Sequence, residues 1–456
     1  FVSAGLISFT QSIGIIIGAN IGTTSIGWII SLVGFKISLT SMSLPIIGAG
    51  ALFRVFARKA IKPYGSVLTG FGLLFLGLAN LQEGMVLQED ILALNILQGE
   101  SFLYLILLVL IGFIMTVILQ SSSASIATTL TFLHVGAITF EQGIFLVIGH
   151  NIGTTVTALF AAIGASVSAK RTALTHVLFN LGTATVITLL YPLFISLTVF
   201  LSTLINGTFD AVLGIAVFHT LFSLVGALVF VPFIHPFAKL VKRILPEKGN
   251  PLTQYLDKNV AAVPAVALEA AYKTLIGIIN ELTEEIIFLV RFQKTSDTFE
   301  KTIEKIEEAI VITREFLDSL HPHSMEDQNR LLSQIHALDH LDRLIKVLKE
   351  EQRIEAISLH HNLMGEWIEI LERIPLSTST DELIKVASSL ENISTVIAEE
   401  RRVKRNKYFL QSVRSETELE TALAKVQALL WIDRLAYHYW RGIHRLTDSA
   451  TVEDLG

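Results

Sequence analysis

Eight apolar runs fill the first 240 residues, and they constrain the fold more than any other feature of the chain. This region contains only 8 Lys and Arg and 6 Asp and Glu, so residues 241–456 hold the remaining 27 basic and 35 acidic residues. A helix needs about 20 apolar residues to cross the hydrocarbon core of a bilayer, and several runs reach that length. Residues 1–245 are therefore predicted to form a membrane domain, and the following part has the charge content of a soluble domain.

The composition excludes several classes of function. The chain has no cysteine, which rules out disulfides, thiolate metal sites and cysteine nucleophiles. Its net charge of −6 lies mostly in the second half and provides no basic surface for a nucleic acid.

A cluster of polar side chains interrupts the apolar sequence between residues 120 and 155. It opens with Gln120 and three serines and closes with a Gly-His-Asn-Ile-Gly-Thr-Thr segment that ends at Thr155. Such groups are costly at membrane depth unless they contact each other, water or a ligand. The stretch has no Lys or Arg, and its one acid is Glu141. We therefore interpret it as a binding site.

The chemistry of this cluster favours ion transport over catalysis. Amide and hydroxyl oxygens suit a hard cation such as sodium, while hydroxyls and N–H groups at broken-helix N-termini suit a small oxyanion. A site without a fixed cation can bind an anion if cations enter with it, which is a physical reason for symport. The serines have no Gly-x-Ser-x-Gly context, so we do not expect an enzyme.

The chain also repeats itself at a spacing of 131 residues. Residues 20–24, Asn-Ile-Gly-Thr-Thr, recur as residues 151–155, and Gly5 falls on Gly136. Small residues at close helix contacts are one explanation. We favour a transporter built from two related halves with a site near the bilayer midplane. The same spacing places a first Gln-Ser-Ser-Ser about a dozen residues before Phe1, so we expect the chain to be part of a longer sequence.

The distribution of Lys and Arg predicts the orientation in the membrane. Basic clusters at residues 54–62, 170–171 and 239–248 are predicted to be cytoplasmic, and the 83–100 loop external. The three apolar runs between residues 100 and 170 must then make an odd number of crossings. Three crossings satisfy this, but we favour one crossing plus a re-entrant hairpin with Gln120 at its start or tip.

The second half of the chain is predicted to be a helical bundle. Proline, glycine and asparagine mark a linker at residues 246–264, and strand signals are scarce in residues 265–456. Apolar residues at helical spacing predict six helices, at about 265–291, 297–320, 325–352, 354–373, 380–402 and 415–446. His336 and His340 are one turn apart and are weak metal candidates, but solvated or capping roles are favoured and no metal site is assigned.

The polar motifs of the first half resemble the sodium/phosphate cotransporter family, in its type II and bacterial forms. The resemblance implies an all-α, polytopic membrane transporter with two inverted repeats and re-entrant hairpins. It also implies sodium-coupled uptake of inorganic phosphate, with sodium co-transported and no organic cofactor. By this resemblance the phosphate and sodium site is lined by Gln120, Ser121, Ser122, Ser123, Asn151, Thr154 and Thr155, with Asn20, Thr23 and Thr24 as counterparts in the first repeat.

The second half resembles the PhoU-like domain that many bacterial members of this family carry. The Pro-Ala-Val-Ala-Leu-Glu sequence from Pro264 is one basis for this, and the order of the helices is another. Residues 337–343 and 431–434 also resemble each other, which suits two three-helix halves. We expect this bundle to regulate or scaffold.

The combined prediction is a sodium-dependent phosphate symporter of a bacterial inner membrane with a cytoplasmic helical bundle. Its expected partners are inorganic phosphate, sodium and the lipid bilayer, but no nucleic acid, and a homodimer is considered. Two alternatives stay open: a membrane-anchored phosphate sensor or signalling scaffold, and a symporter of another small anion such as sulfate or a dicarboxylate.

Overall fold

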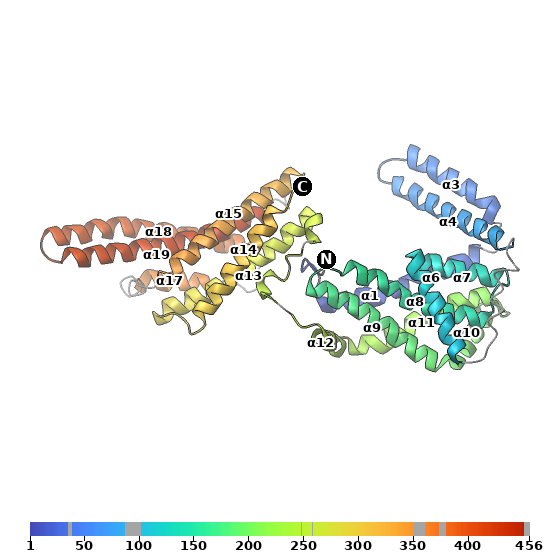
Figure 1. Cartoon of the computed structure of the whole chain (residues 1–456). Coiled ribbons are helices and arrows are strands. Elements are labelled where there is room, and N and C mark those ends of the chain that lie inside the picture. The colour runs from blue at the N-terminus through green and yellow to red at the C-terminus, as the bar shows by residue number, and fades with distance from the viewer. Residues whose placement is uncertain are drawn as a thin grey trace. The chain divides into compact units, whose positions relative to one another are not determined.

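The computed structural model describes residues 1–34, 39–86, 102–247, 249–257, 259–350, 361–373 and 380–450. Among these residues the regular structure is helical and no strand occurs, so the all-α prediction is confirmed (Figure 1). The chain divides into two units, which are described separately. The membrane unit comprises Ser8–Ile163 and Ser168–Pro246, and the bundle unit comprises Phe1–Ile7, Gly164–Val167 and Glu247–Gly456.

The membrane unit is built from apolar helices. Within the described residues, five stretches are long and apolar enough to cross a bilayer; they fall on α1–α2, α4, α8, α9 and α11–α12. The helices are α1 (Phe9–Thr23), α2 (Ser25–Ile29), α3 (Leu39–Phe56), α4 (Lys62–Val86), α6 (Phe102–Leu119), α7 (Ser122–His134), α8 (Phe140–Ala161), α9 (Val167–Leu189), α10 (Tyr191–Asn206), α11 (Ala211–Phe230) and α12 (Ile234–Ile244).

Helix α7 is too short to cross a bilayer by itself. Its 13 residues span about 20 Å, against roughly 30 Å of hydrocarbon. It contacts α8 after a short turn, as a hairpin would, and Gln120 lies at the start of this hairpin rather than at its tip.

Glycines bring the backbones of α6 and α8 into direct contact. A Cβ atom added at Gly112 would lie 2.2 Å from the carbonyl oxygen of Leu146, and one at Gly149 would lie 2.1 Å from that of Val109. Real Cβ atoms essentially never approach so closely, so only glycine fits at either position. This packing fixes α8, which carries the second Asn-Ile-Gly-Thr-Thr motif, against α6.

The motif helices, α1 and α8, each carry one Asn-Ile-Gly-Thr-Thr motif, and they begin in the same way. Ser8 caps α1 and Thr139 caps α8, and each forms a reciprocal capping box with the glutamine three residues later. A left-handed glycine precedes each cap, with φ of 69° at Gly5 and 77° at Gly136. The sequence repeat is therefore also a repeat of local structure, while the inverted relation of the two halves stays a prediction.

The bundle unit contains six long helices in its described part. Its hydrophobic core includes the fully buried rings of Trp367, Trp431 and Tyr439. The long helices α18 and α19 run side by side (Figure 1). The helices are α13 (Pro264–Phe292), α14 (Phe299–Asp318), α15 (Met325–Leu348), α17 (His361–Leu371), α18 (Thr380–Val413) and α19 (Leu419–Ala450).

The two similar sequence segments of this unit lie on α15 and α19, which pack together. Asp342 on α15 lies 3.8 Å from the guanidinium of Arg314 on α14. In the same way, Asp433 on α19 forms an ion pair with Arg401 on α18. An aspartate on the third helix of each half thus faces an arginine on the second, which suits a bundle of two related three-helix halves.

Some predictions concern residues that the structure does not describe. The predicted external loop 83–100 falls largely on residues 87–101, and the predicted helix 354–373 begins within residues 351–360; both ranges lie outside the described residues. Helix α18 extends to Val413, beyond its predicted end at residue 402.

Candidate functional site

Gln120 and the three serines lie at a break between two helices. Helix α6 ends at Leu119 and α7 begins at Ser122. Gln120 has a φ of 52°, a left-handed conformation that is unusual for a residue other than glycine. Ser121 caps α7, and its hydroxyl oxygen accepts a hydrogen bond from Ala124 N at 3.2 Å. The break therefore presents Gln120, Ser121–Ser123 and the first N–H groups of α7 in one place.

The second motif of the site lies on α8, where its polar side chains bond to their own helix. The Asn151 amide donates from Nδ2 to the carbonyl oxygen of Val147 at 2.9 Å. Thr154 and Thr155 donate their hydroxyl protons to the carbonyls three residues earlier, both at 2.7 Å. Thr154 and Thr155 thus keep only oxygen lone pairs for a ligand, whereas Asn151 keeps its Oδ1 and the second proton of its amide.

The first repeat shows the same pattern of donation. Asn20 Nδ2 donates to the carbonyl of Ile16 at 3.0 Å, and Thr23 and Thr24 donate to carbonyls three residues earlier, both at 2.8 Å. Thr24 lies at the one-residue interruption between α1 and α2. The equivalent bonds of Thr154 and Thr155 lie within the continuous helix α8, so the two motifs share these bonds but differ in the continuity of the helix.

Helix α11 contacts the motif helices of both repeats, α1 and α8, and also α7. The hydroxyl of Ser223 on α11 donates to the main-chain oxygen of Asn20 at 3.1 Å. Trp28 on α2 donates from Nε1 to Thr220 Oγ1 at 2.8 Å. No hydrogen bond between described residues joins Gln120–Ser123 directly to either motif. The two repeats meet through α11 and also directly, because α2 contacts α7.

His150 is a structural residue of this site that the sequence reasoning did not assign. Its buried ring lies 2.9 Å from the carbonyl oxygen of Gly112 on α6 through Nδ1, and 2.7 Å from Thr129 Oγ1 on α7 through Nε2. Because a carbonyl can only accept, Nδ1 carries the proton and Nε2 accepts from the threonine. His150 therefore ties three helices together beside Asn151. Its counterpart in the first repeat is Ala19, and this difference is the one sequence signal for it.

Three more polar atoms are buried in the membrane unit with no hydrogen-bond partner among the described residues: Thr175 Oγ1, Asn180 Oδ1 and His219 Nδ1. They lie on α9 and α11, in the two similar His-x-Leu-Phe segments of the sequence. Buried polar atoms are normally satisfied, so these are places where water or an ion could bind.

The weak metal candidates of the bundle do not form a metal site together. His336 is exposed, whereas His340 on α15 meets His438 on α19, with their Nδ1 atoms 3.2 Å apart. Burial is the main cause that lowers the pKa of His340 to about 4, and the neighbouring His438 lowers it further. Burial also lowers the pKa of His438. In the described part of the chain, no group of three potential ligands could hold a metal ion.

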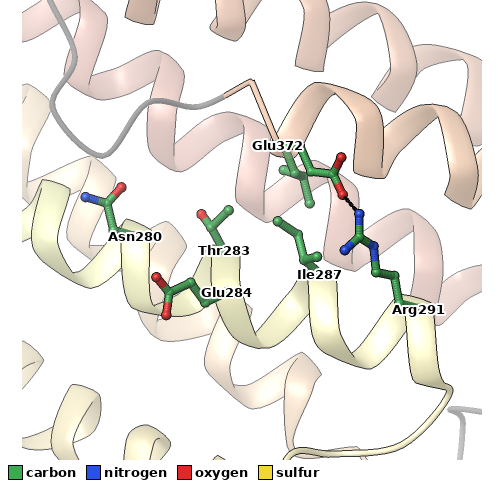
Figure 2. A pocket seen from close by; sticks show the side chains of 7 residues that line it. Asn280, Thr283, Glu284, Ile287, Arg291 and Glu372 are labelled. Atoms are coloured by element: carbon green, nitrogen blue, oxygen red, sulfur yellow. Dashed lines mark hydrogen bonds and ion pairs between the residues drawn. The ribbon is translucent and has the colours of Figure 1, made fainter.

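The bundle also has a pocket of about 320 Å³ between α13 and the end of α17. Figure 2 shows its lining residues, with an ion pair between Arg291 and Glu372 at one end. Three further polar side chains, Asn280, Thr283 and Glu284, line it from α13. Thr283 also bonds to the buried hydroxyl of Tyr439, so part of the wall is fixed by the core of the bundle.

Comparisons with known proteins agree with the motifs. The family model described as Na+/Pi-cotransporter matches residues 1–83 and 105–226. An uncharacterized protein of Bacillus subtilis, YqeW, is 34% identical over 254 residues, which cover 54% of this chain and 77% of the relative. No solved structure matches.

Two other relatives have names that include phosphate. A putative inorganic phosphate export protein of Salmonella typhimurium, YjbB, is 27% identical over 311 residues, covering 67% of this chain and 55% of the relative. The human sodium-dependent phosphate transport protein 2B is 40% identical over 80 residues, covering 17% of this chain and 12% of that protein. The chain thus spans about half the length of the YjbB relative, and the comparisons give no support to a homodimer.

The match to YqeW covers most of that relative, and the family model covers most of the membrane unit. Both comparisons agree with the motif helices described above, and the family is one of transporters, so the expectation that the chain is not an enzyme is confirmed. The chain belongs to the Na+/Pi-cotransporter family.

Proposed function

We propose that the protein moves inorganic phosphate across a bacterial inner membrane together with sodium ions. The observation that carries this proposal is the pattern of donation at the Asn-Ile-Gly-Thr-Thr motifs. In both repeats the asparagine amide and the threonine hydroxyls donate into their own helix. The threonine atoms left for a ligand are therefore oxygens that cannot donate to an anion, and each asparagine presents its Oδ1 beside one remaining amide proton. These oxygens suit a hard cation such as sodium.

The break before α7 has the complementary chemistry. Its serine hydroxyls and the N–H groups of the first turn can donate, and the positive end of the helix dipole favours an anion. No Lys or Arg occurs in residues 120–155. The charge of a bound phosphate is therefore balanced by sodium ions on the motif oxygens, which makes the binding of the two ions interdependent.

The bundle is part of the same proposal, as a cytoplasmic PhoU-like regulatory domain. The support for this is the pair of matching contacts, Asp342 with Arg314 and Asp433 with Arg401, which suits two three-helix halves. A membrane-anchored phosphate sensor is the second candidate, and the polar pocket beside Asn280 and Thr283 favours it because a sensor needs a ligand site in its soluble part.

Paired flux measurements on the full-length protein in liposomes test the proposal. Radiolabelled phosphate should move only when sodium is present, and radiolabelled sodium only when phosphate is present. A phosphate flux in potassium or choline equal to that in sodium would reject sodium coupling. A sulfate flux as fast as the phosphate flux would reject phosphate as the specific substrate. Binding of phosphate without any flux would favour the sensor.

The direction of transport is tested in the same liposomes. Coupled flux follows the sodium gradient, so reversing that gradient should reverse net phosphate movement. One relative is named as an export protein, and export that continues against an inward sodium gradient would contradict a sodium-driven symport.

A further inference from the structure

The bundle unit includes two short segments from elsewhere in the chain, residues 1–7 and 164–167. Ala4 has no exposed surface and belongs to the hydrophobic core of the bundle, together with Val260 and residues of α13. The segment before α1 is thus anchored in the bundle by buried apolar contact.

Polar contacts hold the same segment. Lys273 on α13 donates from Nζ to the main-chain oxygen of Gly5 at 2.6 Å. Ser3 and Ser166 share a hydrogen bond between their hydroxyls at 2.9 Å. Ser166 in turn donates its main-chain N–H to the buried carboxylate of Asp257 at 2.6 Å. These contacts connect residues 1–7, residues 164–167, the linker and α13.

The two repeats differ at this turn. Gly5 and Gly136 occupy the same position before the same capping box, and both have a positive φ. A Cβ atom at Gly5 would lie 2.6 Å from the ring of Tyr255, whereas a Cβ at Gly136 would have no described atom within 4 Å. The bundle therefore holds the turn of one repeat, and the equivalent turn of the other repeat is open.

The held turn leads directly into a motif helix. Ile7 is followed by Ser8, the cap of α1, and α1 carries Asn20 and Thr23. A transporter with two related halves alternates by moving one half against the other. The turn at Gly136 bonds to the end of α7, from Gly136 N to Leu133 and from Ala137 N to Phe132. The turn at Gly5 can follow α1 only if its contacts break or the bundle moves with it.

We propose that the bundle acts as a brake on the first repeat by holding the turn of residues 1–7. This inference rests on the proposed phosphate transport and adds its regulation. The brake slows the movement of α1 between states and leaves the binding oxygens unchanged. Loosening it should therefore raise the maximal flux and leave the phosphate KM as it is.

A pair of lysine substitutions tests the brake in the full-length protein. Lys273→Met keeps the apolar stem and removes the donor to Gly5, and it should raise maximal phosphate flux about twofold or more at unchanged KM. Lys305→Met is the matched control, because Lys305 is equally exposed (30% against 31%) and pairs with Glu281 within the bundle. Flux at or below the wild-type value for Lys273→Met, or an equal rise in both variants, would overturn the brake.

A reversible cross-link gives the opposite test. The chain has no cysteine, so Ser3→Cys combined with Ser166→Cys introduces a single pair that should form a disulfide on mild oxidation. The oxidised protein should transport roughly fivefold more slowly, and a reductant should restore the rate; Ser3→Cys alone is the control. Failure to cross-link, or cross-linked protein with a normal rate, would overturn the proposal. Absence of phosphate flux in the wild type would reject the proposed function and the brake together, whereas normal flux that no variant changes would reject the brake alone.

Discussion

Asn20 and Asn151 make the same hydrogen bond in two separate helices: each side-chain amide donates to the carbonyl oxygen four residues earlier, at 3.0 and 2.9 Å. Both residues are buried, with 8% and 4% of their surface exposed. The bond fixes the orientation of each amide, so Oδ1 and the second amide proton are the groups that remain for a ligand. The two repeats thus hold equivalent oxygens, and their surroundings differ through Ser223 in one case and His150 in the other.

Removing either oxygen should weaken sodium binding more than phosphate binding. Asn151→Ala and Asn20→Ala are each expected to raise the sodium concentration for half-maximal flux about tenfold, equivalent to ~1.4 kcal/mol. Flux measured against sodium at saturating phosphate checks this. Asn206→Ala is the control, because this exposed asparagine ends α10. A larger change in the phosphate KM than in the sodium requirement would contradict the assignment of oxygens to sodium.

Loss of the His150 ring should destabilise the membrane unit. His150→Ala removes the acceptor of Thr129, and an unsatisfied buried hydroxyl costs about 1–3 kcal/mol. It also removes one donor to the Gly112 carbonyl, which still accepts from Thr116 Oγ1 at 3.3 Å. Thermal unfolding in detergent should show a lower midpoint. Thr129→Ala should reproduce part of this loss, whereas Thr128→Ala should not, because Thr128 bonds only to its own helix at Ala124. Equal midpoints for the two threonine variants would contradict the role of His150.

Part of the site could be predicted from sequence because it depends on local geometry. The recurring Asn-Ile-Gly-Thr-Thr letters predicted two equivalent motifs, and both form the same bonds three or four residues along their own helices. The role of His150 could not be predicted in this way. It depends on Gly112 and Thr129, which lie 38 and 21 residues away, and no periodic pattern brings those residues together.

Enlarging Gly149 should disrupt the membrane unit in proportion to the added volume. A Cβ there would lie 2.1 Å from the carbonyl oxygen of Val109, which is backbone and cannot rotate away. Gly149→Ala is expected to cost about 1–3 kcal/mol, and Gly149→Val more. The fraction of monodisperse protein after extraction measures this, in the order wild type, Ala, Val. Wild-type yield for the valine variant would show that α6 and α8 do not pack in this way.

Acid should destabilise the bundle through the His340–His438 pair. Burial holds the pKa of both rings below the usual value of 6.5, to about 4 for His340, so the unfolded chain binds protons more readily than the folded one. The contribution of this pair to the free energy of unfolding is therefore complete above pH 6.5 and is lost as the pH falls toward 4. Thermal unfolding at pH 7 and pH 5 should show a smaller decline for His438→Gln than for the wild type. Exposed His336→Gln is the control, and it should follow the wild type at both values of pH.

The bundle shows a different limit of sequence reasoning. Apolar spacing predicted its six helices in the described part, with most boundaries within a few residues. Helix α18 was the exception, because it continues to Val413 through Arg401 and Lys404. In the structure Arg401 bonds to Asp433 on α19 and Lys404 to Glu400, so the charges support a continuing helix. The pair of Arg401 with Asp433 joins residues 32 positions apart, so a local sequence window cannot predict it.

The glycine contact between α6 and α8 also limits how the protein can move. Sliding α8 by one residue, about 1.5 Å along its axis, would bring a larger side chain against the backbone where Gly149 now meets Val109. The two helices can therefore travel only as one rigid body, and any change of access must come from hinges at their ends. Spin labels on α6 and α8 should report one constant separation throughout the transport cycle. The two helices therefore give a fixed reference against which the movement of other helices can be measured.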